Sequence, residues 1–303
     1  MISAKVVKEL RDKTGAGMMD CKKALTETNG DLELAIAVLR EKGLASAAKK
    51  SGRVASEGVI ATYVSDDRKN AAMIELNCET HFVSANADFI QLANDIAKIA
   101  AENVAETIDD VKVLSYNGKT VQDAVTDLIS KLGENMNLRR FEKMSAEDGL
   151  VSSYIHMGGK IGVLVQVKSE NNTEEISSVV RDVAMHVAAL NPMFLDQSSV
   201  DDKTIQAERE IYRAQALNEG KPEKIVDKMV DGRINKYFKE VCLVNQVFVK
   251  NPDFTVEKFI ADESKKHGKI ELVKFTRFEK GEGIEKEEVD FAAEVAAQMG
   301  QNK

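Results

Sequence analysis

The fold of this chain is decided by a stretch that occurs twice, as EGVIATYV at residues 57–64 and as DGLVSSYI at residues 148–155. The two copies match position by position in residue class, and Tyr63 and Tyr154 stand at the same place in each. A match at every position indicates that one structural unit has been duplicated. We interpret each stretch as the first strand of that unit.

The two copies continue in the same order but differ in length. Each first strand is followed by a second strand with alternating apolar residues and then by an Ala-rich helix. When Asp95 of one helix is aligned with Asp182 of the other, the first copy is four residues longer. The connection ETHFVSAN at residues 79–86 contributes to this excess. An apolar Phe82 on an elaborated loop suggests a functional site.

The charge distribution disfavours nucleic-acid binding. The 303 residues include 42 basic and 50 acidic residues without a dominant basic block, and the net charge is −8. Binding through phosphates needs a concentrated positive face. The length allows two or three modules rather than one compact core. We therefore expect a multi-module protein whose partner is another protein and not a nucleic acid.

Cysteine and histidine usage predicts neither disulfides nor a metal site. Cys21, Cys78 and Cys242 lie far apart, which is typical of a reducing compartment. The four histidines show no pairing at metal-ligand spacing. The N-terminal residues MISAKVV contain no leader pattern, and no apolar stretch approaches the length of a membrane span. We predict a cytoplasmic protein without membrane contact.

Residues 1–52 are predicted to form an N-terminal three-helix bundle. The glycine-rich TGAG at residues 14–17 ends the first helix, and a second helix follows directly. Asp31 is a good N-terminal cap for the third helix. We expect Lys42-Gly43 to stop this helix and residues 45–52 to form a short polar linker.

The chain as a whole is predicted to be α+β, with an antiparallel sheet and helices in the duplicated core. Asn191-Pro192 ends the helix of the second copy, because proline cannot continue a helix. Residues 270–277 form a further strand, and residues 287–299 a terminal amphipathic helix. We divide the chain after the bundle into residues 53–144 as the first core subdomain, 145–199 and 241–280 as the two parts of the second, 200–240 as a helical hairpin, and 281–303 as a C-terminal module.

The hairpin is predicted from two charge-rich helical patterns separated by EGKP at residues 219–222. Its apolar stripe is narrow, which favours an arm that projects from the core. Such an arm commonly carries partner or self-association contacts, so a homodimer through it is one expectation. The alternative is an ordinary hairpin packed on its own domain.

The sequence lacks patterns for nucleotide binding and catalysis. GKT at residues 118–120 has Val113 where a phosphate-binding loop needs glycine, so we interpret it as a turn. GGK at residues 158–160 is followed by Ile161 where Ser or Thr is required. No serine nucleophile motif and no Cys/His pair is present. We predict that the protein is not an enzyme and has no cofactor and no catalytic residues.

Several motifs resemble those of the bacterial elongation factor Ts family. TGAGMMDCKKAL at residues 14–25 and NCETHFV at residues 77–83 are similar to its two signatures. The resemblance continues through IGVLV at 161–165, GIEK at 283–286 and DFAAEVA at 290–296, and so covers essentially the whole chain. It implies a UBA-like N-terminal module, a duplicated core, a coiled-coil dimerisation arm and a C-terminal module.

The resemblance implies a role in translation. Members of this family exchange GDP for GTP on elongation factor Tu, and a Thr-Asp-Phe-Val loop enters the partner and displaces its Mg²⁺. Thr80, His81, Phe82 and Val83 occupy this loop here, with Phe82 as the inserted wedge. His81 stands where the family usually has Asp, and a neutral imidazole reproduces a carboxylate only in part. The sequence therefore does not fix the exchange rate.

Further partner contacts are implied by the same resemblance. Arg11, Met18 and Met19 occupy positions at which the N-terminal module touches the GTPase, and flexible Met side chains suit such a surface. His156 matches a contact with another domain of the partner, although the MGGK that follows it differs from the usual loop.

The residues taken alone leave other interpretations open. Phe82 could pack back onto its own sheet, and Met18 and Met19 could fill the core of the bundle. The protein could be an adaptor that binds partners without exchanging nucleotide. RNA binding through basic residues at 49–53 is a weaker alternative, which the acidic balance opposes.

Overall fold

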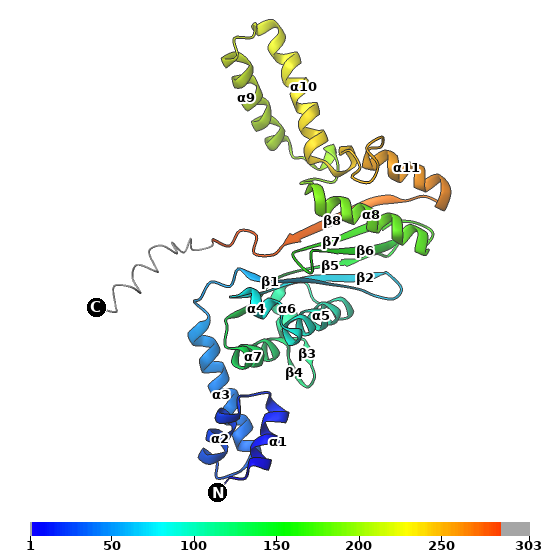
Figure 1. Cartoon of the computed structure of the whole chain (residues 1–303). Coiled ribbons are helices and arrows are strands. Elements are labelled where there is room, and N and C mark those ends of the chain that lie inside the picture. Colours follow the sequence, from blue (N-terminus) through cyan, green and yellow to red (C-terminus); the bar gives the residue numbers. More distant parts are fainter. Residues whose placement is uncertain (1, 286–303) are drawn as a thin grey trace, which may run out of the picture.

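The chain folds around two three-stranded antiparallel sheets with the same strand order (Figure 1). The computed structural model describes residues 2–285. The first sheet has the order β1-β2-β5 and the second the order β6-β7-β8. Their strands are β1 (Glu57–Val64), β2 (Asn70–Cys78), β5 (Met136–Ser145), β6 (Leu150–His156), β7 (Ile161–Lys168) and β8 (Glu271–Glu279). Each predicted copy thus forms one sheet, and the α+β class is confirmed.

The two sheets pack face to face in the middle of the core. Ile60 and Met73 of the first sheet meet Val151 and Leu164 of the second in one buried cluster. Gly162 lies at this contact, since a Cβ there would be 2.4 Å from Cγ2 of Ile60. The central strand β2 is therefore buried on both of its faces.

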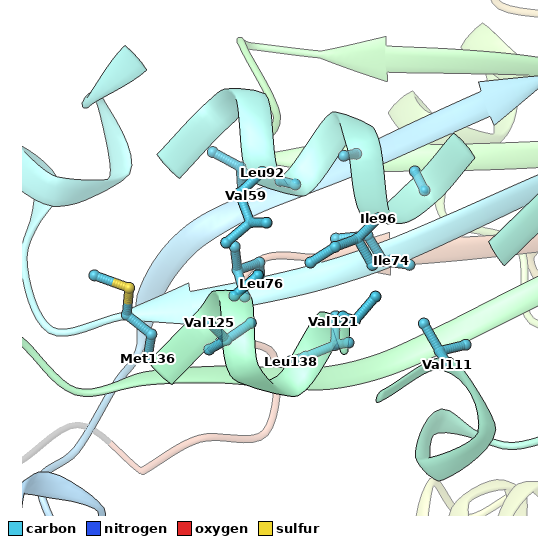
Figure 2. Close-up of a cluster of buried hydrophobic side chains, with 14 of the residues drawn as sticks. Val59, Ile74, Leu76, Leu92, Ile96, Val111, Val121, Val125, Met136 and Leu138 are labelled. Carbon is cyan, nitrogen blue, oxygen red and sulfur yellow. The ribbon is translucent and has the colours of Figure 1, made fainter. Parts of the chain in front are cut away.

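Helices cover the outer faces of the sheets. They are α5 (Ala87–Glu102) and α7 (Val121–Leu132) on the first sheet, and α8 (Glu174–Leu190) with α11 (Val256–His267) beside it on the second. Figure 2 shows the first of these cores, where Leu92 and Ile96 of α5 face Ile74 and Leu76 of β2. Burying each such side chain contributes about 1.5–3 kcal/mol. The core therefore has four layers in the order helix, sheet, sheet, helix.

Short elements complete the first copy. They are α4 (His81–Ser84), α6 (Ile108–Val113), β3 (Ser115–Tyr116) and β4 (Lys119–Thr120). Asn117 and Gly118 both have positive φ in the turn between β3 and β4, as a tight hairpin requires. Thr120 then caps α7. The GKT motif is thus part of a hairpin turn, as predicted.

The N-terminal bundle consists of three helices, α1 (Ala4–Thr14), α2 (Met18–Glu27) and α3 (Leu32–Lys50). Gly15 adopts the left-handed conformation that ends α1, and the carboxylate of Asp31 accepts a hydrogen bond from Leu34 N at the start of α3. Leu10 and Leu25 are fully buried between the helices. The predicted end of the first helix and the predicted start of the third are confirmed.

The prediction that Lys42-Gly43 stops the third helix is wrong. Helix α3 continues to Lys50, so most of the predicted linker at residues 45–52 is helical. Gly43 is buried, and a Cβ there would lie only 2.8 Å from Oγ of Ser130 on α7. This glycine allows α3 and α7 to approach closely, and Arg40 forms an ion pair of 2.9 Å with Asp123 beside it. Tertiary packing decides the role of this glycine.

A helical hairpin projects from the second copy (Figure 1). It consists of α9 (Asp202–Asn218) and α10 (Glu223–Val241), between the 3₁₀ turns η1 (Gln197–Ser199) and η2 (Leu243–Asn245). Its narrow buried stripe includes Val226, Val230 and Ile234. Asn191 adopts the left-handed conformation that ends α8 before Pro192. The projecting hairpin and the end of α8 agree with the prediction.

A buried carboxylate holds the end of β8 against the first sheet. Glu75 is fully buried and lies 3.1 Å from Nη1 of Arg139 and 2.5 Å from Nε of Arg140. It also accepts a hydrogen bond of 2.7 Å from the backbone N–H of Gly281. Pairing of this kind offsets the cost of removing the charge from water.

The predicted terminal helix at residues 287–299 lies outside the described residues.

Candidate functional site

The extra residues of the first copy lie between its second strand and its first long helix. There β2 ends at Cys78 and α5 begins at Ala87, whereas in the second copy β7 ends at Lys168 and α8 begins at Glu174. The longer connection contains α4, a single helical turn that carries the predicted loop residues. The second copy has no helix at this place. The site therefore lies where the duplicated units differ.

The turn is closed by its own residues, two of which were predicted as site residues. Oγ1 of Thr80 accepts a hydrogen bond of 3.4 Å from Val83 N, so Thr80 caps α4. Val83 is buried in the core of the first copy. The hydroxyl of Ser84 donates a hydrogen bond of 2.9 Å to the backbone oxygen of His81. Thr80 and Val83 thus hold the turn in place from inside.

Phe82 points away from the fold. Its side chain is 88% exposed, which rules out the alternative that it packs back onto its own sheet. The neighbouring His81 is exposed as well, with Nδ1 at 3.4 Å from the Ser84 hydroxyl. Leaving a Phe side chain in water forgoes about 1.5–3 kcal/mol of burial. An exposed aromatic ring on an ordered turn is typical of a surface that binds another molecule.

Glu134 fixes the start of this loop. Its Oε2 accepts hydrogen bonds from the backbone N–H groups of Glu79 at 3.1 Å and Thr80 at 2.9 Å. Its Oε1 accepts a third, of 2.5 Å, from the Thr80 hydroxyl. Sequence reasoning did not identify Glu134, because it follows α7 far along the chain and resembles any surface glutamate.

A second acidic residue links the loop to the chain that leaves the N-terminal bundle. Oε1 of Glu79 accepts a hydrogen bond of 2.5 Å from Asn135 N and lies 3.5 Å from Nη1 of Arg53. The side-chain amide of Asn135 donates a bond of 2.7 Å to the backbone oxygen of Arg53. One network of hydrogen bonds and an ion pair therefore joins the loop, the turn that follows α7 and the segment after α3.

The thiol beneath the loop is unreactive. Sγ of Cys78 donates to the backbone oxygen of Thr80 at 3.3 Å. Burial raises the pKa of this thiol to about 12, and the carboxylates of Glu134 and Glu57 add to the effect. The thiol thus stays protonated near neutral pH and is a poor nucleophile.

The other predicted contact residues are exposed but lie on separate elements. Arg11, Met18 and Met19 lie on α1 and α2, and the two methionines are 53% and 62% exposed. The alternative that they fill the core of the bundle is therefore wrong. His156 is the last residue of β6, and its Nδ1 lies 3.0 Å from the Tyr154 hydroxyl. No described interaction brings these residues together with Phe82.

Two further properties concern residues 2–285. No group of His, Cys, Asp and Glu side chains among them could hold a metal ion. None of the helices that they form is long and apolar enough to span a membrane.

The chain is similar to known proteins over nearly all of its length. The family model "Elongation factor TS" matches residues 79–282. Elongation factor Ts of Clostridium botulinum (strain ATCC 19397 / Type A) is 59% identical, with all of both chains covered. The proteins of the same name from Clostridium tetani (strain Massachusetts / E88) and Clostridium novyi (strain NT) are 61% and 55% identical, over 99% of this chain and all of theirs. With this identity over its full length, the chain belongs to the elongation factor Ts family.

Proposed function

We propose that this protein is a guanine-nucleotide exchange factor for elongation factor Tu. The observation that carries the proposal is the exposed Phe82 on a hydrogen-bonded loop, in a chain that belongs to the elongation factor Ts family. Such a factor binds the nucleotide-free GTPase more tightly than the loaded one. By linkage, it weakens nucleotide binding by the same factor.

Phe82 is the inserted group in this mechanism. A Phe ring buries on the order of 150–250 Å² in a pocket, which is enough to displace a loop that contacts phosphate or metal. Mg²⁺ tolerates little distortion of its octahedral shell, so a small movement of its ligands loosens the ion and with it GDP. The exchange factor itself binds neither nucleotide nor metal and makes no covalent bond.

The remaining predicted residues have supporting roles in this proposal. His81 enters the partner beside Phe82, while Arg11, Met18, Met19 and His156 provide contacts elsewhere. Because these contacts lie on both the bundle and the core, the partner is a large protein that spans both. The hairpin of α9 and α10 is the coiled-coil arm through which two copies of the chain associate.

The proposal is tested by release of fluorescently labelled GDP from elongation factor Tu. Phe82→Ala should lower the rate at saturating exchange factor by about 30-fold, the effect of an interface residue worth about 2 kcal/mol. Binding to the partner, measured by pull-down, should change far less. Val104→Ala is the matched control, because it removes another exposed apolar side chain, 90% exposed, away from the loop. An unchanged rate for Phe82→Ala contradicts the insertion mechanism.

An adaptor that does not exchange nucleotide remains the second candidate, and competition separates the two. An exchange factor and GDP oppose each other on the GTPase, so excess GDP should release the partner in a pull-down. An adaptor would retain its partner at any GDP concentration.

A further inference from the structure

We infer that Glu134 is the positioning residue that holds the Phe82 loop ready for insertion. The inference rests on the proposed function and assigns a role to a residue on a different element from the loop. One carboxylate accepts three hydrogen bonds there, two from successive backbone N–H groups and one from the Thr80 hydroxyl. All three donors precede Phe82 by two or three residues. The carboxylate thus fixes the backbone from which the ring projects.

A carboxylate suits this contact better than a neutral amide. Both oxygens of Glu134 are acceptors and both are used, and bonds to a charged acceptor are stronger than neutral ones. A glutamine could keep its one oxygen on the backbone N–H groups and donate its amide to the Thr80 hydroxyl, but the bonds to a neutral acceptor would be weaker. An aspartate is shorter by one methylene and would pull the loop back or lose a bond.

The residue itself is held on a rigid corner. Gly133 ends α7 in the left-handed conformation, and Asn135 is tied to Glu79 and Arg53 on the other side. Lys131, in the last turn of α7, pairs at 2.7 Å with Asp88 in the first turn of α5. Both ends of the loop are therefore fastened to the same corner. A loop fixed in this way loses little conformational freedom when Phe82 enters a partner.

The duplicated unit supplies an internal comparison. In the second copy α11 ends at Gly268, and the residue after it is Lys269, which pairs with Glu271 of β8. The short connection there is tied to this corner by a single bond from the Asn171 amide to the backbone oxygen of His267. The carboxylate thus occurs in the copy that displays the aromatic ring, whereas the residue that follows the helix-ending glycine in the other copy is a lysine.

The test measures the maximal rate of GDP release from elongation factor Tu. It compares the effect of Glu134→Ala in the parent protein with the effect of Glu134→Ala in a protein that already carries Phe82→Ala. Loss of bonds to a charged acceptor should lower the rate about tenfold, with a smaller change in partner affinity. Glu134→Ala should lower it no further once Phe82 is absent, because Glu134 acts through that ring. Lys269→Ala is the matched control in the second copy and should leave the rate unchanged.

The mobility of the loop can be measured by the fluorescence anisotropy of a tryptophan placed at position 82. The chain contains no tryptophan, so Phe82→Trp gives a single fluorophore. Its anisotropy in the isolated protein should fall when Glu134→Ala is added, whereas an unfolding midpoint close to that of the parent shows that the fold is intact. Should Glu134→Ala fail to fold, Thr80→Val and Glu134→Gln each weaken the same contact, and should lower both anisotropy and rate.

The outcomes separate the two proposals. If Phe82→Ala leaves the rate unchanged, the proposed insertion mechanism fails. If Phe82→Ala lowers the rate but Glu134→Ala changes neither rate nor anisotropy, the positioning role of Glu134 alone is wrong. An equal further loss in the Phe82→Ala background also overturns it, because Glu134 would then act independently of the ring.

Discussion

The two copies of the duplicated unit each form a sheet with the same strand order, and they differ at one corner of it. In both, a helix ends at a glycine with positive φ, Gly133 or Gly268, and the chain returns as the third strand. The first copy uses this corner to hold a long loop with an exposed Phe82. The second copy has a short connection there and instead inserts the projecting hairpin before α11. The sheet is thus the common scaffold, and the differences that matter for function lie in what connects its strands.

The largest expected effect is on the free energy of unfolding, and it concerns a glycine that both copies have at the start of their first strand. Gly58 and Gly149 are equivalent, with φ of 142° and 128°. A Cβ on either would lie 2.1 Å from the backbone oxygen of Leu76 or 2.0 Å from that of Val167. Gly58→Ala and Gly149→Ala should each lower the free energy of unfolding by about 3–5 kcal/mol, from backbone strain and overpacking together. Urea unfolding followed by circular dichroism measures this loss.

A glycine without such constraints provides the control for that experiment. Gly52 has no positive φ, and a Cβ there would meet nothing within 4 Å. Gly52→Ala should therefore change the free energy of unfolding by less than about 1 kcal/mol. A clear difference in cost between Gly58→Ala and Gly149→Ala would show that the two first strands are not equivalent.

The next effect concerns the corner at which the copies differ. Replacing residues 79–86 with SENNT, the connection at residues 169–173, should lower stimulated GDP release about 30-fold, as far as Phe82→Ala does. The fold should survive, since the shorter connection already joins the same elements in the second copy. The loss of the buried Val83 and the bonds to Glu134 should together cost about 2–4 kcal/mol of stability.

The reverse exchange sharpens the same point. ETHFVSAN placed at residues 169–173 would set a Phe beside Lys269, without a carboxylate to hold it. Combined with Phe82→Ala, this graft should not restore GDP release. Restored release would mean that the loop sequence acts without its supporting corner.

Local sequence patterns predicted the parts of the fold that depend on local chemistry. Caps such as Asp31 and breakers such as Asn191-Pro192 mark helix ends because their hydrogen bonds and backbone angles involve near neighbours. Alternation located the strands of both copies. The narrow stripe of the hairpin was sufficient to predict that it projects.

The features that sequence reasoning missed depend on distant contacts. Gly43 reads as a helix stop, yet its partner is Ser130 on α7. Glu134 follows a glycine, as many surface residues do, and only the fold brings it to Thr80. The exposure of Phe82 could not be decided either, since a ring on a loop can pack inward or point to solvent. The family resemblance identified the loop, while its support required the structure.

The smallest effect concerns a buried group present in the second copy alone. Helix α8 carries His186, fully buried, where α5 carries Ile99. Its Nε2 donates to the Gln246 side chain at 2.9 Å, and its Nδ1 accepts from Val249 N at 3.1 Å. A protonated ring would turn Nδ1 into a donor facing another donor. Burial lowers the pKa of His186, whereas the bond to Gln246 opposes this in part.

The sign of the pH dependence follows from this lowered pKa. Below the ordinary value of about 6.5 the unfolded chain binds a proton at this position and the folded chain does not, so acid favours unfolding. The free energy of unfolding should therefore fall between pH 7.5 and 5.5, by less than the limit of about 1.36 kcal/mol per pH unit for one proton. His186→Gln, which cannot take up a proton, should show a shallower slope in urea unfolding at both pH values. Parallel slopes for the two proteins would mean that His186 takes up a proton in the folded chain as readily as in the unfolded chain.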